Sequence, residues 1–496
     1  MGLEIEKSSF TEQEFRSFHR RLDNNLEALK LLLSRSGFGK GPASVGAELE
    51  LYIVDRNGHP LAVNGEILAE VGDPQLTLEL NRYNLEYNLT PVPARGAPFS
   101  AIEAEMSRKL GELEQAAQHH QGHIIAIGIL PTLRRSDFGP RVMTGQRRYQ
   151  ALTEGLARIR GERFTVRING AEPISLRARD VTLEGANTSM QLHYRVSPRQ
   201  FADSYNGIQL ATPVALALAT NSPFMLGQRL WQETRIPLFK HAIDGSTRDC
   251  HGVKKASRVG FGTGWVRDGA YELFAESVLL HQPILPICND GEDALAQVQN
   301  GELPALRELR LHHGTVWSWN RVIYDDSADG HLRVEMRALP AGPTPCDMMA
   351  NAAFLIGLGE GFKSEIRELM PALPFPMLSY NFYRAAEHGL GARLLWPSPG
   401  DRRLVELPVT ELARNLLPVA EAGLARVGVR EAERRYYLGI IANRLERNRN
   451  GSTWQLEQVA RLSRRLSRHR ALRTMLEYYR ANACANQPVA EWADIR

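Results

Sequence analysis

Four short segments of the chain alternate between apolar and polar residues, which is the pattern of strands with one buried face. The segments span residues 45–55, 82–91, 187–196 and 331–339. In the first, apolar Leu49 separates Glu48 from Glu50, and Ala47 and Leu51 extend the apolar face. Because each segment has an unbroken apolar face, we predict four strands that pack against helices.

The polar faces of these predicted strands carry an unusual set of side chains. The set consists of carboxylates, an amide and an imidazole: Glu48, Glu50, Glu86, Gln191, His193 and Glu335. Any one of these glutamates, taken alone, is best interpreted as a solvated residue, because antiparallel sheets often have one wet face. The four strands together favour a shared cleft, provided that they join one curved sheet.

Helical spacing of apolar residues marks much of the remaining chain. It predicts helices over residues 9–36, 98–121, 144–160 and 199–220. The continuous apolar run 123–131 predicts a short buried strand. From about residue 345 to the end, the patterns are almost all helical.

Composition and charge narrow the class of protein. Apolar residues make up 43% of the chain and charged residues 23%, which is typical of a folded globular protein. A net charge of +4 is too small to indicate a polyanionic partner by itself. No apolar run is long enough for a membrane span, and the N-terminus lacks the apolar segment of a secretory signal. We expect no membrane association and a cytoplasmic location, which four scattered cysteines without a CxxC pair also favour.

The C-terminal region is strongly basic. Residues 430–480 contain thirteen arginines and five glutamates, and neither lysine nor aspartate. The favoured interpretation is a helical region with a solvated basic face. The alternative is a surface for anions or nucleic acid, but the segment lacks the interleaved aromatic residues that stack on bases. We therefore do not expect a nucleic-acid partner.

The polar faces indicate metal-dependent chemistry. Several carboxylates held close together repel one another, and a divalent cation relieves that repulsion. Oxygen-rich ligands with little nitrogen suit Mg²⁺ or Mn²⁺, whereas zinc prefers Cys and His. Arg333 and Arg337 flank Glu335 on the same face. An arginine beside a carboxylate-bound metal ion is well placed to bind a phosphate group. The glycine loop 260–264 has no lysine followed by Ser or Thr after it, so we predict phosphoryl transfer outside the P-loop class.

Several motifs, in this order, resemble the glutamate–cysteine ligase family, and within it the carboxylate–amine ligase branch. They are GAELEL, LEYNLTP, TSMQLHYRV, LALATNSPFMLG and LRVEMRALPAGPTP, and the resemblance covers residues 43–360. It implies an α+β fold shared with glutamine synthetase and the guanidino kinases. In this fold a curved antiparallel sheet has helices packed on its convex face and the active site in its concave face, and a mostly helical C-terminal region follows. We divide the chain accordingly into an N-terminal helix (1–42), a glutamine synthetase-like catalytic domain (43–370) and a basic helical region (371–496).

The resemblance also implies a reaction and its residues. ATP phosphorylates a substrate carboxylate, and an amine then attacks the acyl phosphate to form an amide. Mg²⁺, with Mn²⁺ as the alternative, would be held by Glu48, Glu50, Glu86, His193 and Glu335. Arg337 would contact the transferring phosphate and, with Glu335, would be catalytic. Gln191, Arg321 and Arg333 would bind the cofactor or substrate, although Arg321 is also interpreted as a surface strand residue.

The simplest substrate pair is the γ-carboxylate of glutamate with cysteine. Residues 254–285 do not match the short bacterial members of the family, so another amino acid or amine is the first alternative. A degenerate ligase that binds an anion or a protein partner is the alternative of another class, and the intact set of polar residues argues against it. The helices beyond residue 370 could support the sheet, form a homo-oligomer interface or bind an anionic substrate.

A few further residues have two interpretations each. His312 and His313 precede the fourth strand and are interpreted equally as substrate contacts or as part of a turn. Asn221 equally caps a helix end or belongs to a substrate-binding turn. The histidines within 119–123 favour a solvated helix end over a metal site. Cys346 is interpreted as a buried thiol, because nothing near it in sequence would lower its pKa.

Overall fold

The computed structural model describes residues 9–243, 256–289, 291 and 293–495. The first eight residues lie outside this part of the chain, so the structure does not describe the N-terminus from which we expect no secretory signal. Cys250 also lies outside it. Within it, no helix combines the length and the apolar character that crossing a bilayer requires.

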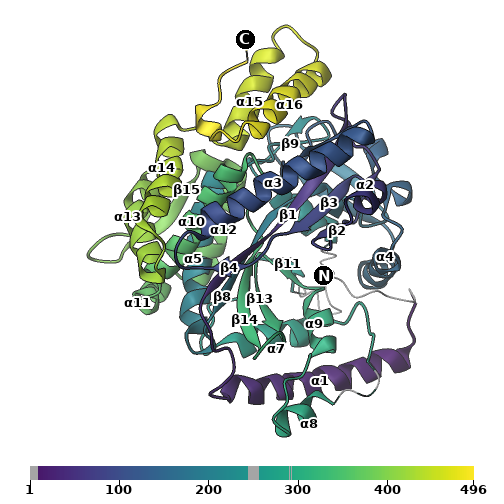
Figure 1. Ribbon diagram of the computed structural model, residues 1–496, viewed down its shortest axis with the longest axis vertical. Helices are drawn as coiled ribbons and strands as arrows, with labels where there is room; N and C mark the ends of the chain where they lie inside the picture. The colour runs from purple at the N-terminus through teal and green to yellow at the C-terminus, as the bar shows by residue number, and fades with distance from the viewer. Residues whose placement is uncertain (1–8, 244–255, 290, 292, 496) are drawn as a thin grey trace.

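An eight-stranded antiparallel sheet lies at the centre of the described chain (Figure 1). Its main path runs in the order β13 (Asn320–Asp325), β14 (His331–Met336), β8 (Met190–Val196), β1 (Ser44–Asp55), β3 (Asn84–Asn88) and β2 (Leu76–Leu78). Two further strands, β4 (Val92–Pro93) and β5 (Gly122–Ile125), pair with the two ends of β1. The four predicted strands are confirmed as β1, β3, β8 and β14, and they are consecutive in the sheet.

The apolar face of the sheet packs against a layer of helices. The layer contains α3 (Pro98–His119), α5 (Phe201–Ala219) and α10 (Pro345–Phe362). Leu49 and Leu51 of β1 are fully buried on this side. The helices α5 and α10 approach closely at glycines. A Cβ atom on Gly207 would overlap the carbonyl oxygen of Gly359, so only glycine allows this approach. The predicted α+β class, with helices on the convex face of a curved sheet, is confirmed.

Other helices stand on the polar side of the sheet. They are α1 (Glu12–Ser34), α4 (Arg147–Arg160), α7 (Ala270–Leu280), α8 (Ala294–Gln299) and α9 (Arg307–His313). The helix α1 packs against α7, α8 and α9 and begins with a capping box between Thr11 and Glu14. The helix α4 is tied to the edge of the sheet, because Arg148 and Tyr149 both donate hydrogen bonds to the carbonyl of Leu78.

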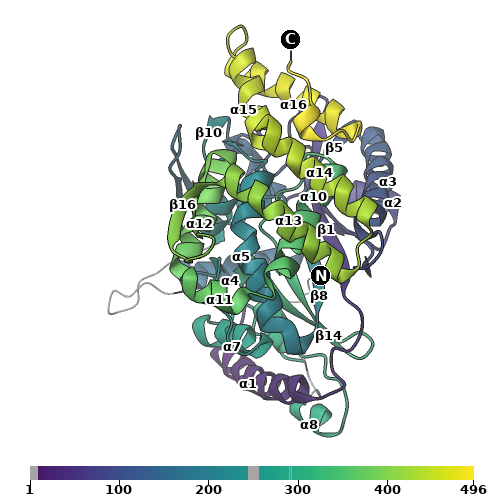
Figure 2. The same cartoon turned by 90° about the vertical axis from the view of Figure 1, so that its left-hand side faces the viewer.

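The C-terminal region is helical, as predicted, with one exception. It contains α11 (Ile366–Ala372), α12 (Phe375–His388), α13 (Val409–Val427), α14 (Glu431–Arg447), α15 (Gly451–Leu462) and α16 (Arg468–Cys484) (Figure 2). A hairpin of β15 (Arg393–Pro397) and β16 (Leu404–Pro408) interrupts them. Helical spacing could not reveal it, because tertiary contacts fix this strand: the side chain of Asn381 bonds both the N–H and the carbonyl of Leu395.

Two hydrophobic cores lie within the described chain. The larger contains the apolar face of the sheet and side chains of helices from α1 to α14. The smaller joins residues of a second group of elements to Trp454 of α15 and Tyr479 of α16. That group includes α6 (Arg235–Ile243), β6 (Phe164–Ile168), β7 (Ile174–Ala178) and β9 (Phe224–Met225). Short elements complete the fold: α2 (Asn64–Val71), β10 (Gln228–Arg229), β11 (Val259–Gly260) and β12 (Trp317–Ser318). The division at residues 42 and 370 stays a prediction.

One predicted strand is shorter than its apolar run. Only the first residues of the run 123–131 belong to a strand, because β5 ends at Ile125. Ile127, Ile129 and Leu130 are buried in the smaller core without joining the sheet. A continuous apolar run therefore indicates burial rather than strand pairing.

Candidate active site

A cavity of about 730 Å³ lies over the polar face of the sheet. It is bounded by strands of the sheet and by helices α4, α7 and α9. Every residue that the sequence proposed for the site lines it: Glu48, Glu50, Glu86, Gln191, His193, Arg321, Arg333, Glu335 and Arg337. The structure thus brings the predicted set together, while the role of each residue stays a prediction.

Three of these side chains face one another across adjacent strands. Glu335 lies directly opposite His193 in the pairing of β14 with β8, and β8 in turn pairs with β1, which carries Glu48. The Nε2 atom of His193 is 3.0 Å from an oxygen of Glu48 and 3.9 Å from an oxygen of Glu335. All three ligand atoms lie within 4.8 Å of one another.

These three residues fit a divalent cation. The Nε2 atom of His193 is buried and makes no well-aligned hydrogen bond within the described chain, despite its short distance to Glu48. A buried polar atom without a partner is costly, and a metal ion would satisfy it. Two carboxylates and one imidazole form the mixed oxygen and nitrogen ligand set that Mg²⁺ and Mn²⁺ accept.

The charges of this group are balanced within the protein. Burial would raise the pKa of Glu335, but Arg321 and Arg337 hold it well below the usual range. Burial would also raise the pKa of Glu48, and the neighbouring His193 lowers it instead. Both carboxylates are therefore ionised and available to a cation at neutral pH.

A second group of carboxylates lies beside the first. Glu50 of β1 is directly opposite Glu86 of β3. Burial, together with the facing Glu86, raises the pKa of Glu50 to about 8. Burial, together with Glu48, raises the pKa of Glu86 to about 7. Such a cluster holds protons at neutral pH unless a cation replaces them.

Sequence reasoning missed two further acids of this group. Glu79 follows β2 and Glu184 lies in a short 3₁₀ turn before β8, and both line the cavity. Burial, with Glu79 nearby, raises the pKa of Glu184 to about 8, and the pKa of Glu79 is also raised by burial and by Glu86. Alternation in the segment TLEL, from Thr77 to Leu80, could have placed Glu79 on the polar face. No sequence signal marks Glu184.

The arginines of the site take different positions. Arg321 of β13 binds Glu335 through two hydrogen bonds, of 2.7 and 3.1 Å. Arg337 lies 3.3 Å from Glu335 and donates a hydrogen bond to Gln191. Gln191 in turn donates to Glu50 at 2.8 Å, so it links the two acidic groups. Two guanidinium groups thus lie beside the carboxylates, where they could neutralise a phosphate.

Arg333 is turned toward the supporting structure. Its guanidinium pairs with Asp325 of β13, and its Nε donates to the Nδ1 atom of His193 at 3.1 Å. This contact orients the ring so that Nε2 faces Glu48. Arg333 thus contacts His193 as well as lining the cavity, and the cofactor contact that the sequence suggested for it stays a prediction.

Apolar and aromatic side chains also line the cavity. They include Phe274, Leu285, Leu311, Trp317 and Ile323. His313 lines the cavity too, and its Nε2 contacts the carbonyl of Val322 at 2.9 Å. Burial, with Arg321 nearby, lowers the pKa of His313 to about 3, so the ring is neutral. Apolar and aromatic lining together with charged groups suits a ligand with a flat base and a phosphate chain.

The remaining candidates lie elsewhere. Asn221 is buried and donates hydrogen bonds to the carbonyl of Ala341 and to Tyr479, which favours a structural turn. Glu70 binds both His119 and His120 on the surface at the end of α3. Cys346 is fully buried, and burial raises the pKa of its thiol to about 12.

Comparison with known proteins adds a family and a fold. A sequence model described as glutamate–cysteine ligase family 2 matches residues 44–469. No curated protein matches the chain. A crystal structure of glutamate–cysteine ligase from Francisella tularensis, in complex with AMP, is similar at 12% identity over 90% of both chains, with a TM-score of 0.50. A bifunctional glutathione synthetase from Pasteurella multocida is 11% identical over 94% of this chain and 55% of its own, with a TM-score of 0.43. At such low identity, the first of these structures supports the fold alone.

Proposed function

Because the chain belongs to glutamate–cysteine ligase family 2 and is an ATP-dependent carboxylate–amine ligase, we propose that it joins the γ-carboxylate of glutamate to the amino group of cysteine. We propose further that the reaction passes through an acyl phosphate. A carboxylate oxygen attacks the γ-phosphorus of ATP, and ADP leaves. The amine nitrogen then attacks the acyl carbon, phosphate leaves, and the nitrogen loses a proton.

The observation that carries this proposal is the juxtaposition of ionised carboxylates, an imidazole and two arginines in one cavity. We propose that Mg²⁺ is held by Glu48, His193 and Glu335 on one side, and by Glu50 and Glu86 on the other. Mn²⁺ is the alternative ion. A metal ion held by these residues would supply positive charge that offsets the negative charge of the ATP phosphates.

The residues of this chain then have distinct tasks. Arg337 lies beside Glu335 and Gln191, where its guanidinium can contact the γ-phosphoryl group during transfer. Arg321 holds Glu335 in place through two hydrogen bonds, and Glu335 keeps its charge as a result. The apolar and aromatic part of the lining, with Phe274 and Trp317, would receive the adenine ring.

A different acid or amine is the second candidate for the same reaction. Phe274 and Leu285 line the cavity, and both belong to the segment 254–285, which we expect to differ from the short bacterial members of the family. We also propose a reducing, cytoplasmic setting. The free thiols of Cys346 and Cys484 support it.

The test is phosphate release from MgATP by the full chain, with glutamate and cysteine compared against a panel of other amino acids and amines. We expect the fastest release with glutamate and cysteine together. A preference for another pair would change the proposed substrates but would leave the proposed type of reaction in place. Absence of both turnover and MgATP binding would contradict the ligase proposal.

Two variants test the site itself. Glu335→Gln and Arg337→Ala should each lower phosphate release by about 10²-fold or more, because each removes charge that acts on the transferring group. Arg435→Ala, on the surface of α14, is the matched control and should be neutral. Circular dichroism should show an unchanged fold in all three, and near-normal rates for the first two would show that the site lies elsewhere.

A further inference from the structure

One face of the molecule carries exposed arginines without ion-pair partners. Six of them, taken from five separate segments, define what we call the arginine face: Arg135, Arg167, Arg177, Arg229, Arg464 and Arg465. None of their side chains forms an ion pair or a hydrogen bond within the described residues. Arginines elsewhere on the surface, such as Arg108, Arg402 and Arg435, are paired with glutamates. Unpaired guanidinium groups leave this face with a strong positive potential.

The tertiary structure brings these segments together. Arg468, at the start of α16, donates to the carbonyl of Gly227, next to β10, at 3.1 Å. It also pairs at 2.8 Å with Glu172, in the turn between β6 and β7, and the same carboxylate accepts the N–H of Arg229. The turn before α16, the β6–β7 hairpin and β10 therefore meet at one point.

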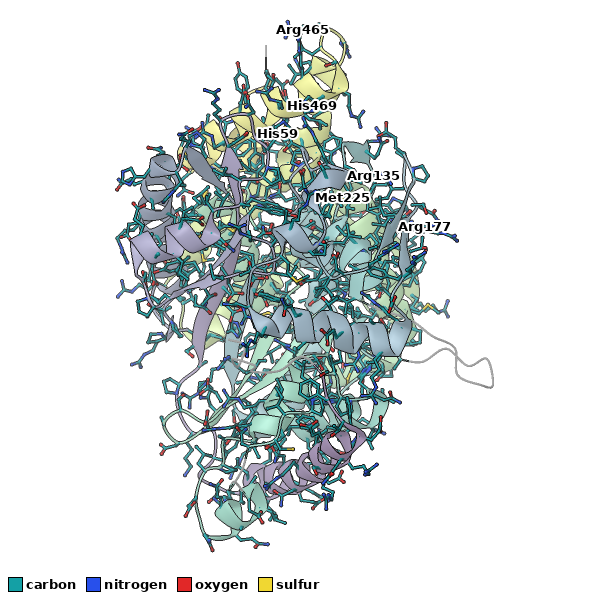
Figure 3. All side chains as sticks on the ribbon, turned by 90° about the vertical axis from the view of Figure 1, so that its right-hand side faces the viewer. His59, Arg135, Arg177, Met225, Arg465 and His469 are labelled. Atoms are coloured by element: carbon teal, nitrogen blue, oxygen red, sulfur yellow. The ribbon has the colours of Figure 1, made fainter. Side chains whose placement is uncertain are left out.

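A second contact adds the loop at residue 135. The ring of His469 stacks on that of His59 with 5.3 Å between centroids. The guanidinium of Arg134 lies 3.0 Å from the Nε2 atom of each ring. Figure 3 shows Arg135, Arg177, Arg465 and both histidines on the same side of the molecule.

The chemistry of the arginine face indicates its partner. The large apolar side chains exposed on the described surface come from other elements: Leu31, Leu279, Leu280, Met377, Tyr380, Leu404, Val405, Tyr436 and Tyr478. Membrane binding and protein docking usually need apolar or aromatic anchors, and base stacking needs aromatic rings. Guanidinium groups alone suit a repeating array of phosphates, which they bind in a bidentate manner.

We propose that the arginine face binds double-helical nucleic acid through its phosphate backbone, without reading the base sequence. The sequence alone did not favour such a partner, because the basic C-terminal segment lacks the aromatic residues that stack on bases. Binding to the phosphate backbone needs no such residues, and four of the six arginines lie outside that segment. The proposal is independent of the ligase reaction, since none of the six residues lines the catalytic cavity.

The test measures binding of a labelled RNA or DNA duplex of about 20 base pairs to the full chain by fluorescence anisotropy. With about six phosphate contacts, we expect affinity to fall by about 10³-fold between 50 and 200 mM salt. Duplexes of unrelated sequence should bind equally. No binding at 50 mM salt would overturn the proposal.

A charge-reversed variant and a matched control locate the surface. Arg464→Glu with Arg465→Glu should weaken binding by about tenfold or more and reduce the salt slope by about two. The control, Arg402→Glu with Arg403→Glu, makes the same change in net charge at an adjacent arginine pair in the β15–β16 turn. It should leave affinity within about twofold, and equal losses in the two variants would contradict the assignment.

Two competing ligands distinguish nucleic acid from an acidic protein and from a membrane surface. Polyglutamate that binds as tightly as the duplex at equal charge would indicate an acidic protein instead. Tighter binding to vesicles of anionic lipid would indicate a membrane surface, and either result would overturn the proposal. Phosphate release should be unchanged in both variants, which shows that each is folded.

Discussion

The imidazole of His193 and the carboxylate of Glu48 face each other across β8 and β1, with 3.0 Å between Nε2 and the nearer oxygen. Glu335, on the other neighbour of β8, lies 3.9 Å from the same nitrogen. Three adjacent strands thus each contribute one ligand atom to a single point. An antiparallel sheet can hold such atoms rigidly, because its ladder fixes the position of each side chain.

Removal of the charge on Glu48 should weaken metal binding. We expect Glu48→Gln to lower the affinity for Mn²⁺ by about tenfold or more, because an amide is a weaker ligand than a carboxylate of the same shape. Titration calorimetry with the metal alone measures the effect, so the result does not depend on turnover. Glu70→Gln is the matched control, since Glu70 also contacts histidines but lies on the surface. Equal affinity in the two variants would place the metal elsewhere.

Arg333 should act through His193. We expect Arg333→Gln to lower the affinity for Mn²⁺ by about tenfold, because it frees the ring that Arg333 orients through Nδ1. The affinity for the nucleotide without metal, followed by the binding of a fluorescent ATP analogue, should change by less than about twofold. A larger loss of nucleotide affinity than of metal affinity would restore the cofactor contact that the sequence suggested.

The metal-free protein should lose stability as the pH rises. The pKa of Glu50 is raised to about 8 and that of Glu86 to about 7, against an ordinary value of 4.5. Between the ordinary pKa of 4.5 and these raised values, the folded protein keeps protons that the unfolded chain has already released. The free energy of unfolding therefore falls as the pH increases over this interval. Thermal melting in EDTA should therefore give a lower Tm at about pH 8 than at about pH 6.

Two further melts test the origin of that slope. Saturating Mg²⁺ should raise the Tm most at the higher pH, because the cation stabilises the ionised carboxylates that destabilise the metal-free fold. Glu50→Gln should flatten the dependence in EDTA, since it removes one titrating group. A Tm that rises over the same interval in EDTA would contradict the raised pKa values.

The phenol of Tyr479 should stabilise the junction between α16 and the turn at Asn221. Its hydroxyl donates to the carbonyl of Ala126 at 2.8 Å and accepts from Asn221 at 2.8 Å, and the side chain is fully buried. Tyr479→Phe leaves these groups without a partner, so we expect a loss of about 1–3 kcal/mol in the free energy of unfolding. Urea denaturation measures it. The neighbouring Tyr478 is 48% exposed, and Tyr478→Phe should cost less than about 0.5 kcal/mol.

The local pattern of the sequence determined the strands and most of the predicted site. Alternation of apolar and polar residues depends only on the pleat, so Glu48, Glu86 and Glu335 could be placed on polar faces before any fold was known. The same reasoning was too narrow for Glu79, which follows a strand of only 3 residues, and it could not find Glu184, which lies in a turn. The family resemblance then gave the curved sheet that makes the faces converge.

Tertiary structure alone decided which groups meet and with what charge. Arg321 and Arg337 keep Glu335 ionised, while Glu50 and Glu86 face each other and hold protons, although all three acids look alike in sequence. Packing also decided which arginines of the basic C-terminal segment are paired with acids. It placed Arg464 and Arg465 on the arginine face, together with residues of the β6–β7 hairpin. The physical reason is that pKa values and surface potential depend on distances through space, whereas the periodicity of side chains depends only on neighbours along the chain.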